Sequence, residues 1–486
     1  MPVCYLWDGA GRVSVALFHH VRVAAVCACA AWPCAAWAAD QDRVDALERQ
    51  LREAQRQLAE IRASGHSGDG AALKELQRNS AERYARLKQR LDTQPVVGLA
   101  NGRLSVTSAD GAFSLALRGT VQFDTAYFAQ GRNPPSVDLN SGTNFRRAQF
   151  GLVGTLWRDW AYNFTYDFGG NGVEQRGYLY RAYIEYDGLK PVGIRAGAFS
   201  AYDSMEDATG GANLAFMERP TAVTIARSIA GGSGRTGVEV FAQGQRYLVS
   251  LALTGGKTTD AASFDEQQGL VGRVAWLAVD RDDAKWLLNA DASYVLKLAD
   301  TIPGPAAAGM MQLSAGPELS VDASRTIDTG LVDARHVTEF GMETALNLGR
   351  LFGQGGWFHY NIERRSAAPN PDFQGWYAMA TWSLSGESRP YDPDSASFHG
   401  LAPAAPLGKS GFGAWELAAR YSSTNLDYLP SVAGGKQTVW SAGLNWYPNQ
   451  TIRFLLDYDN IRVSHANAQG LNISADAIGL RSQIVF

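Results

Sequence analysis

Hydrophobic and polar residues alternate along most of this chain, from residue 95 to its end, in segments of about ten residues. A period of two places successive side chains on opposite faces of a β-strand. Strands that cross a membrane show it with an apolar face toward lipid and a polar face toward the inside of a closed barrel. The pattern therefore predicts an all-β transmembrane antiparallel barrel. The opposed apolar and polar sets are Phe113, Leu115, Leu117, Val121 and Phe123 against Ser114, Arg118, Thr120, Gln122 and Asp124; Phe150, Leu152 and Leu156 against Arg147, Gln149 and Thr155; Tyr162, Phe164, Tyr166 and Phe168 against Asn163, Thr165 and Asp167; and Ile452, Phe454, Leu456 and Tyr458 against Arg453, Asp457 and Asp459.

A soluble β-sandwich or β-helix also alternates, so other features must separate these folds. Aromatic residues bracket the segments as interfacial girdles do, for example Trp157 with Trp160 and Trp440 with Trp446. The polar faces carry Arg, Asp and Gln, which a sandwich core buries only at high cost. No run of 18 apolar residues follows the first 38, so helices are too polar to span and a closed barrel remains.

The length of the alternating region sets the number of strands. Residues 95–486 are 392 residues, and a membrane strand with its share of turn and loop takes roughly 22–25. We therefore expect about 16 strands (16–18), and barrels of this size leave an aqueous channel. The last segment ends on Phe486, and a terminal aromatic that closes an alternating strand is similar to the outer-membrane assembly signal.

Residues 39–94 have a helical pattern instead and contain no proline. In residues 44–61 the apolar residues are spaced alternately by three and four, which predicts a short coiled coil, and a second helix follows. An amphipathic helix pair folded on the rim of the barrel remains the alternative. The apolar positions are Val44, Leu47, Leu51, Ala54, Leu58 and Ile61, then, after a break at residues 64–70, Leu73, Leu76, Tyr84, Leu87 and Leu91.

Residues 1–38 are predicted to be a cleaved signal peptide. Arg12 and Arg22 precede an apolar stretch at residues 23–31, and Ala36-Trp37-Ala38 supplies the small-x-small cleavage pattern. All four cysteines lie before residue 40. The mature chain therefore has no thiol to mispair in an oxidising periplasm, and cysteine chemistry is excluded.

Composition and charge narrow the function further. The chain has 51 Gly, 20 Phe, 19 Tyr and 13 Trp with 19% charged residues, as expected for many strands and turns. Its net charge of −4 excludes a broad basic face for nucleic acid. The nucleophile motif Gly-x-Ser-x-Gly is absent, because Gly231-Gly232-Ser233-Gly234 is followed by Arg235. A phosphate-binding loop is also absent, because Gly408-Lys409-Ser410 lacks the first glycine of that motif. The histidines do not have the spacing of zinc ligands. We expect neither an enzyme nor a cofactor or metal site.

Several motifs, in order along the barrel, resemble those of the phosphate-selective porins of the O/P type, a family of trimeric sixteen-stranded outer-membrane channels. The resemblance implies a homotrimer in outer-membrane lipid, with a third loop that folds inward and arginines along the path of small anionic solutes. The motifs are Phe145-Arg146-Arg147-Ala148, Gly151-Leu152-Val153-Gly154-Thr155-Leu156, Asp159-Trp160, Phe216-Met217-Glu218-Arg219-Pro220, Leu384-Ser385-Gly386-Glu387-Ser388-Arg389-Pro390-Tyr391, Gly413-Ala414-Trp415-Glu416-Leu417, Arg420-Tyr421-Ser422 and Leu444-Asn445-Trp446-Tyr447.

The candidate path for anions combines the alternation with this resemblance. Guanidinium groups suit oxyanions because they stay charged and offer forked donors. The resemblance places the third loop at residues 202–235, and its Arg219 is the leading candidate. Alternation by itself puts Arg118, Arg147, Arg195, Arg273, Arg420, Arg453 and Arg481 on the lumen face. The predicted anion path is Arg118, Arg146, Arg147, Arg195, Arg219, Arg227 and Arg235.

The sequence also departs from the phosphate channels. Thr120 and Ala198 stand where those channels have basic residues, and residues 95–486 hold 31 Lys+Arg against 37 Asp+Glu. Anion preference must therefore come from a local ring of charge. Two alternatives stay open for the arginines: ion pairs with acidic residues of the wall, and neutralisation of Arg219 by Glu218. A weakly selective general or organic-solute porin, or an envelope tether with the barrel as its anchor, are the other possible functions.

Overall fold

The computed structural model describes Arg56 and residues 70–100, 102–131, 137–170, 177–260, 263–264, 266–301, 309–408, 411–466 and 471–486. The chain forms two compact units, Met1–Leu91 and Asp92–Phe486. The predicted signal peptide and the apolar seam at positions 44–61 lie outside the described residues. The coiled coil therefore stays a prediction.

Helix α2 spans Gly70–Thr93 and covers the second predicted helical segment. Its surface carries charged residues at helical spacing, such as Arg78 and Glu82, whose side chains lie 3.5 Å apart. No helix in the described part of the chain is long and apolar enough to cross a membrane.

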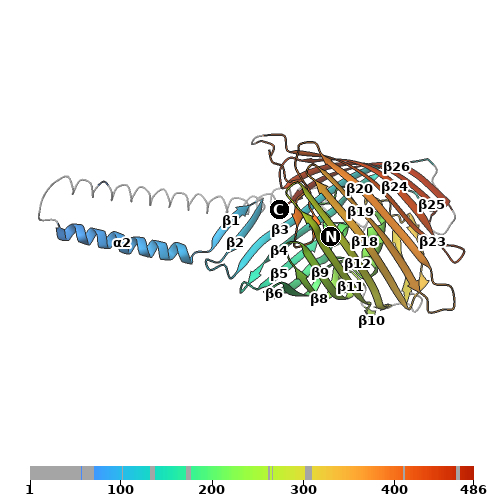
Figure 1. Cartoon of the computed structure of the whole chain (residues 1–486), viewed down its shortest axis with the longest axis horizontal. Coiled ribbons are helices and arrows are strands. Elements are labelled where there is room, and N and C mark those ends of the chain that lie inside the picture. Colours follow the sequence, from blue (N-terminus) through green and yellow to red (C-terminus); the bar gives the residue numbers. More distant parts are fainter. Residues whose placement is uncertain are drawn as a thin grey trace, which may run out of the picture. The chain divides into compact units, whose positions relative to one another are not determined.

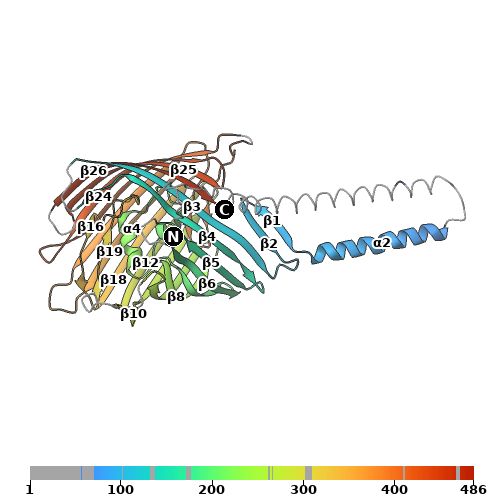
Figure 2. The same cartoon turned by 180° about the vertical axis from the view of Figure 1, so that it is seen from behind.

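The second unit is built around a closed antiparallel barrel, which confirms the fold predicted for this region (Figures 1 and 2). Its last strand pairs with its first, so that Arg481 lies opposite Asp124. A hairpin of β1 (Val96–Ala100) and β2 (Arg103–Thr107) extends the sheet beside β3. The described residues form sixteen barrel strands: β3 (Ser114–Gln130), β4 (Gly142–Leu156), β5 (Trp160–Asp167), β6 (Tyr178–Leu189), β7 (Val192–Ala201), β8 (Gly232–Gln243), β9 (Tyr247–Lys257), β11 (Gln268–Asp280), β12 (Ala284–Lys297), β18 (His336–Leu348), β19 (Leu351–Glu363), β20 (Asp372–Ser383), β23 (Ala414–Tyr428), β24 (Val432–Tyr447), β25 (Ile452–Ala466) and β26 (Leu471–Val485).

The two faces of the wall differ as the alternation predicts. On β20, Trp376 and Trp382 are 43% and 46% exposed on the outside, whereas Tyr377 between them is buried. On β26, Ile478 and Leu480 face outward and Arg481 is buried on the inside. An apolar outer face is what lipid requires, because lipid offers no partner for a polar group.

Three connections fold into the barrel and fill much of its lumen. The first, residues 202–231 between β7 and β8, holds α3 (Met205–Ala208) and α4 (Thr221–Ile229). The second, residues 298–335 between β12 and β18, holds β13 (Asp300–Thr301), β14 (Met310–Met311), β15 (Ser314–Ala315), β16 (Ile327–Asp328) and β17 (Val332–Asp333). β13 pairs with β10 (Ser263–Phe264), which precedes β11. The third, residues 384–413 between β20 and β23, holds β21 (Tyr391–Asp392) and β22 (Ser397–Phe398).

The hydrophobic core of this unit therefore lies inside the barrel, between the wall and the inward connections. Helix α4 contacts β12, β18, β19, β20 and β23 from within, and Figure 2 shows it inside the ring of strands. Phe216, Met217 and Ile225 of the first connection are almost completely buried. Burial of these side chains, at about 25 cal/mol per Å² of apolar surface, holds the connection in the lumen.

Among the β-bulges of the wall, two lie on β4 and β6, the strands on either side of β5. Between β3 and β4, Gln122 pairs with Arg147 and Phe123 with Phe145, so Arg146 is the extra residue. Between β5 and β6, Thr165 pairs with Arg181 and Tyr166 with Leu179, so Tyr180 is extra. A bulge re-aims a side chain that strict alternation sends to the other face. Both members of each pair, Arg146 with Arg147 and Tyr180 with Arg181, accordingly line cavities of the lumen.

Candidate functional site

The first connection forms the narrow part of the lumen because side chains of the wall bind its backbone. Arg453 donates to the carbonyls of Ala212 and Leu214, at 3.2 and 2.7 Å. Asn445 donates to the carbonyl of Ala215 at 2.9 Å. Asp457 accepts the N–H of Met217 at 2.7 Å. Hydrogen bonds between charged groups and buried backbone are worth more than neutral ones, so this path of the chain is closely specified.

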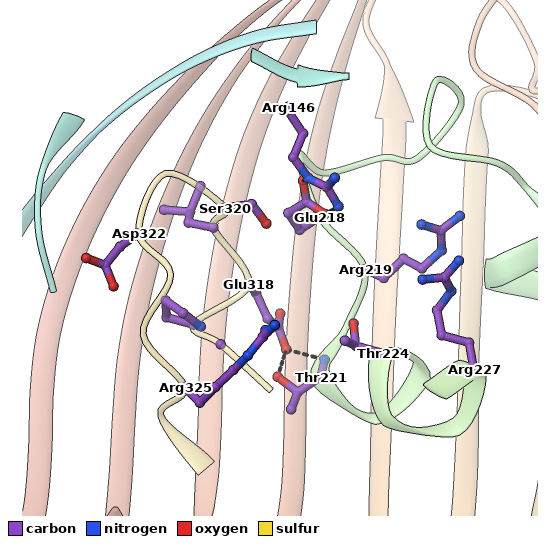
Figure 3. Close-up of a pocket in the computed structure, with 13 residues that line it drawn as sticks. Arg146, Glu218, Arg219, Thr221, Thr224, Arg227, Glu318, Ser320, Asp322 and Arg325 are labelled. Atoms are coloured by element: carbon purple, nitrogen blue, oxygen red, sulfur yellow. Dashed lines mark hydrogen bonds and ion pairs between the residues drawn. The ribbon is translucent and has the colours of Figure 1, made fainter. Parts of the chain in front are cut away.

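Glu318, on the second connection, anchors the start of α4. Its carboxylate accepts from the N–H and hydroxyl of Thr221, both at 2.7 Å, and from Arg420 and Ser422 at 2.7 and 2.6 Å. An acidic group at a helix N-terminus satisfies N–H groups that have no partner within the helix. Figure 3 shows Glu318 between the second connection and α4, so this carboxylate holds two inward segments and the wall together.

Glu218 binds arginines of the wall and not its neighbour in sequence. Arg146 makes a two-point contact with it at 2.6 and 3.0 Å, and Arg481 approaches to 2.9 Å. Burial opposes ionisation of this carboxyl, but Arg146, Arg147 and Arg481 outweigh it and hold the pKa of Glu218 well below its usual range. Glu218 is therefore a fixed negative charge that offsets part of the basic lining.

Arg219 and Arg227 share a different carboxylate, that of Asp207 in α3. The Nε atoms lie 3.2 and 2.7 Å from its Oδ1, and the two guanidinium groups lie side by side in Figure 3. Burial raises the pKa of Asp207, but Arg227 and Arg219 more than compensate and lower it overall. Two cations facing one anion leave a net positive charge at this place.

Three cavities adjoin in the part of the lumen that the structure describes. We call them the outer cavity, of about 70 Å³, the side cavity, of about 90 Å³, and the chamber, of about 920 Å³. The outer and side cavities share Arg146, Arg219 and Arg227 (Figure 3). The side cavity and the chamber share Arg147, Tyr180 and Gly211, which we call the neck. The chamber continues to the short turns that contain Lys190 and Gly244.

Arginines without an acidic partner surround the neck. Among the described residues, no carboxylate lies within 4.0 Å of the guanidinium groups of Arg118, Arg147 or Arg181. Arg147 donates to the Gln122 side chain at 2.6 Å, and Arg181 donates to the Tyr202 hydroxyl at 2.7 Å. These partners are neutral, so no ion pair holds the three guanidinium groups.

The structure separates the arginines of the predicted path into groups. Arg118, Arg146, Arg147, Arg219 and Arg227 line cavities. Arg195 also lines the chamber, but Glu185 and Glu239 hold it at 2.5 and 2.8 Å. Arg235 is 2% exposed, lines none of the three cavities and donates to the carbonyls of Gly231, Gly255 and Ser228. It fastens the base of the first connection.

The other arginines that alternation assigned to the lumen hold inward segments. Arg273 donates to the carbonyls of Ser395 and Ala396 in the third connection, and Arg481 pairs with Asp124 on the wall. Sequence reasoning missed Arg181, Tyr180, Lys257 and Arg325 as lining residues, and it missed the role of Glu318. A search of β6 for polar residues on its inner face finds Arg181; no local signal marks Glu318.

The buried carboxyl group of Glu206 in α3 should make the stability of the barrel depend on pH. Burial raises its pKa to about 7, above its ordinary 4.5. Between pH 4.5 and pH 7 the folded state therefore holds a proton that the unfolded state has lost. The free energy of unfolding receives its full contribution from Glu206 below pH 4.5, and this contribution falls by at most about 3 kcal/mol as the pH rises to 7. Denaturant unfolding at pH 5 and pH 8, followed by tryptophan fluorescence, should show this loss.

The variant Glu206→Gln keeps the size of the side chain but cannot gain or lose a proton. The free energy of unfolding of this variant should therefore change less between pH 5 and pH 8 than that of the unsubstituted protein. Glu266→Gln, at an exposed site, is the matched control and should keep the full pH dependence. An equal pH dependence in Glu206→Gln and the unsubstituted protein would assign the effect to other groups.

No group of three or more His, Cys, Asp or Glu in the described part of the chain has the arrangement of a metal site. The lumen offers instead cationic and hydrogen-bonding side chains around water-accessible space. A closed sixteen-stranded barrel narrowed by an inward loop defines an outer-membrane porin, a channel and not an enzyme.

A model of the family described as phosphate-selective porin O and P matches residues 116–486, and the chain belongs to this family. Porin O of Pseudomonas aeruginosa is 24% identical over 417 residues, which cover 81% of this chain and 93% of that protein. An uncharacterized protein of Caulobacter vibrioides is 26% identical over 366 residues, 74% of this chain and 70% of that protein. The family places the protein in the outer membrane of a Gram-negative bacterium and confirms the predicted resemblance.

Solved structures with a similar arrangement are more distant in sequence. OmpT of Vibrio cholerae is 9% identical with a TM-score of 0.47, over 77% of this chain and 98% of that one. The anion-selective porin from Comamonas acidovorans is 11% identical with a TM-score of 0.45, over 77% of this chain and 100% of that one.

Proposed function

We propose that this porin conducts small anions, phosphate or a related oxyanion among them, by passive diffusion through the outer and side cavities, the neck and the chamber. Arg118, Arg147 and Arg181, which have no carboxylate partner among the described residues, carry the proposal. A buried positive charge without an ion-pair partner is costly, and a passing anion reduces that cost. Arg146, Arg219 and Arg227 extend the path outward from the neck, and Arg235 is left out of it.

The direction of the path follows from the connections. Outer-membrane barrels have short turns on the periplasmic side and longer loops outside. The chamber reaches the short turns, so it is the periplasmic end, and the outer and side cavities face the exterior. An anion entering from outside meets the arginines of the outer and side cavities before it reaches the neck.

The deciding experiment is the zero-current potential across a planar bilayer that holds the purified protein in a KCl gradient, repeated with millimolar phosphate. We expect anion selectivity and a chloride current that phosphate blocks. A weakly selective or cation-preferring pore would overturn the proposal and favour a general porin. Absence of conductance would favour the envelope tether, a function that does not require a chamber of about 920 Å³.

Removal of the fixed negative charge at Glu218 should strengthen anion selectivity. In Glu218→Gln the side chain keeps its shape, while the lumen loses the negative charge that now faces Arg146 at 2.6 Å and Arg481 at 2.9 Å. We expect the chloride-to-potassium permeability ratio to rise about twofold to threefold. This is the effect of removing one charge from a site where the effective dielectric constant is about 20. Reversal potentials measure it, with Glu363→Gln at the rim as the control. An unchanged ratio would mean that Arg146 lies off the conduction path.

We also propose that the chain consists of a cleaved signal peptide at residues 1–38, a helical coiled-coil extension at residues 39–94 and the barrel at residues 95–486. The homotrimer also stays a prediction, and the mass of the detergent-solubilised protein by light scattering tests it.

A further inference from the structure

The chamber is much larger than a small inorganic anion requires. Its volume of about 920 Å³ falls within the roughly 300–1,000 Å³ of pockets that bind organic molecules. The outer and side cavities, at about 70 and 90 Å³, are an order of magnitude smaller. Of these three cavities, the wide one therefore lies on the periplasmic side of the neck.

Aromatic rings stand beside the arginines that have no carboxylate partner. Tyr180, Tyr183 and Tyr202 line the chamber and are each partly exposed. The Tyr183 ring lies against Arg195, whose Cζ is 4.9 Å from the ring centroid. The Cζ atom of Arg181 lies 5.0 Å from the centroid of the Tyr180 ring. Its Nη2 donates to the Tyr202 hydroxyl at 2.7 Å. The bulge on β6 creates this arrangement, because it turns Tyr180 and Arg181 into the lumen together.

Charge in the chamber is arranged along its length. Arg118, Arg147 and Arg181 line the chamber with Tyr180; Arg147 and Tyr180 belong to the neck, and the guanidinium of Arg181 lies against the Tyr180 ring. Asp392 and Asp394, on the third connection, line the periplasmic end together with Asp187 and Lys190, so that carboxylates outnumber cations there. Asp392 lies 3.3 Å from His399, and Gln243 donates to Asp394 at 3.4 Å. An anionic group is therefore favoured at the neck end and disfavoured at the periplasmic end.

We propose that the chamber is a binding site for an organic anion with a flat aromatic part, in which Arg118, Arg147 and Arg181 hold the oxyanion while Tyr180 and Tyr183 contact the ring. This inference rests on the proposed anion path and narrows its substrate class to aryl phosphates and aryl carboxylates. Ring-to-ring contact adds affinity beyond what buried area gives. Guanidinium groups supply the forked donors that phosphate and carboxylate accept.

Phenyl phosphate and methyl phosphate test this, because they carry the same charged group and differ in the ring. At pH 8 both are dianions. We expect phenyl phosphate to block chloride current in planar bilayers at about tenfold lower concentration than methyl phosphate, the effect of one or two aromatic contacts. Block should be stronger from the periplasmic side, where the chamber opens without passage through the neck.

Variants of the tyrosines locate the effect. Tyr183→Leu and Tyr180→Leu should each reduce the preference for phenyl phosphate to about threefold or less, whereas Tyr183→Phe should keep it. Tyr127→Leu is the matched control, since Tyr127 is 64% exposed on the outer face and its loss should leave block unchanged.

The outcomes separate the two proposals. Equal block by the two esters in an anion-selective channel would overturn the aromatic site and leave the anion path intact. A preference for phenyl phosphate that survives both leucine substitutions would also overturn it. A channel without anion selectivity in chloride alone would refute the proposed function itself.

Discussion

Arg147→Gln should weaken block of the channel by phosphate about tenfold or more and reduce its anion selectivity. Arg147 lines both the side cavity and the chamber and is 8% exposed. A hydrogen bond to a charged group contributes about 1.5–3 kcal/mol, and 1.4 kcal/mol is tenfold in affinity. Half-blocking phosphate concentrations and reversal potentials in planar bilayers give the two measurements.

A second variant tests the position of the guanidinium without removing it. Gly211 packs against Arg147, and a Cβ at this position would lie 2.5 Å from the Arg147 Cζ. Gly211→Ala must therefore displace the guanidinium, and we expect weaker phosphate block with the charge of the pore unchanged. Arg462→Gln, at an exposed site of β25 that lines none of the described cavities, is the charge-matched control. Phosphate block that is equal in Arg147→Gln and the control would remove the neck from the anion path.

Glu318→Ala should loosen the start of α4 in the first connection and turn a narrow channel into a wider, noisier one. The carboxylate accepts four hydrogen bonds, and Arg420 loses its acidic partner with it. Breaking a buried ion pair by removal of one partner costs about 3–5 kcal/mol. We expect single-channel conductance to rise at least about twofold with frequent transitions between levels, because the connection is no longer held in one position.

Glu318→Gln keeps the shape of the side chain and should give an intermediate conductance, which protects the test if the alanine variant fails to assemble. Asp328→Asn removes one charge from the same connection at a partly exposed site that binds Gln312, and it should conduct normally. Single-channel recordings compare the three variants. Normal conductance and noise in both Glu318 variants would show that other contacts suffice to hold α4.

The chain could be predicted to form a barrel because the membrane acts on each strand separately. Lipid outside and polar groups inside require hydrophobic and polar residues to alternate along each strand. This alternation can be recognised in the sequence of each strand by itself. The faces of Trp376, Tyr377 and Arg481 follow from it without any knowledge of their neighbours. Length set the strand number, since each strand with its connections needs a similar number of residues.

The interior was decided by tertiary contacts, because its partners lie far apart in the chain. Local sequence suggests that Glu218 neutralises Arg219, but in the folded chain it binds Arg146 and Arg481. Alternation places Arg147 and Arg481 equally in the lumen, yet one lines the neck and the other pairs with Asp124. Which arginines remain available to an anion depends on where the inward connections pack.

The sequence by itself therefore determined the barrel architecture, its location in a membrane and which arginines of the wall face the lumen. The physical causes of these features are local and are repeated along the chain. Only the tertiary structure decided which of those arginines hold loops and which line cavities. It also decided that bulges bring Arg146 and Tyr180 inside, because a one-residue irregularity in pairing leaves no periodic trace in sequence. The physical reason is the same in each case: solvent acts residue by residue, whereas ion pairs and packing in the lumen require the whole fold.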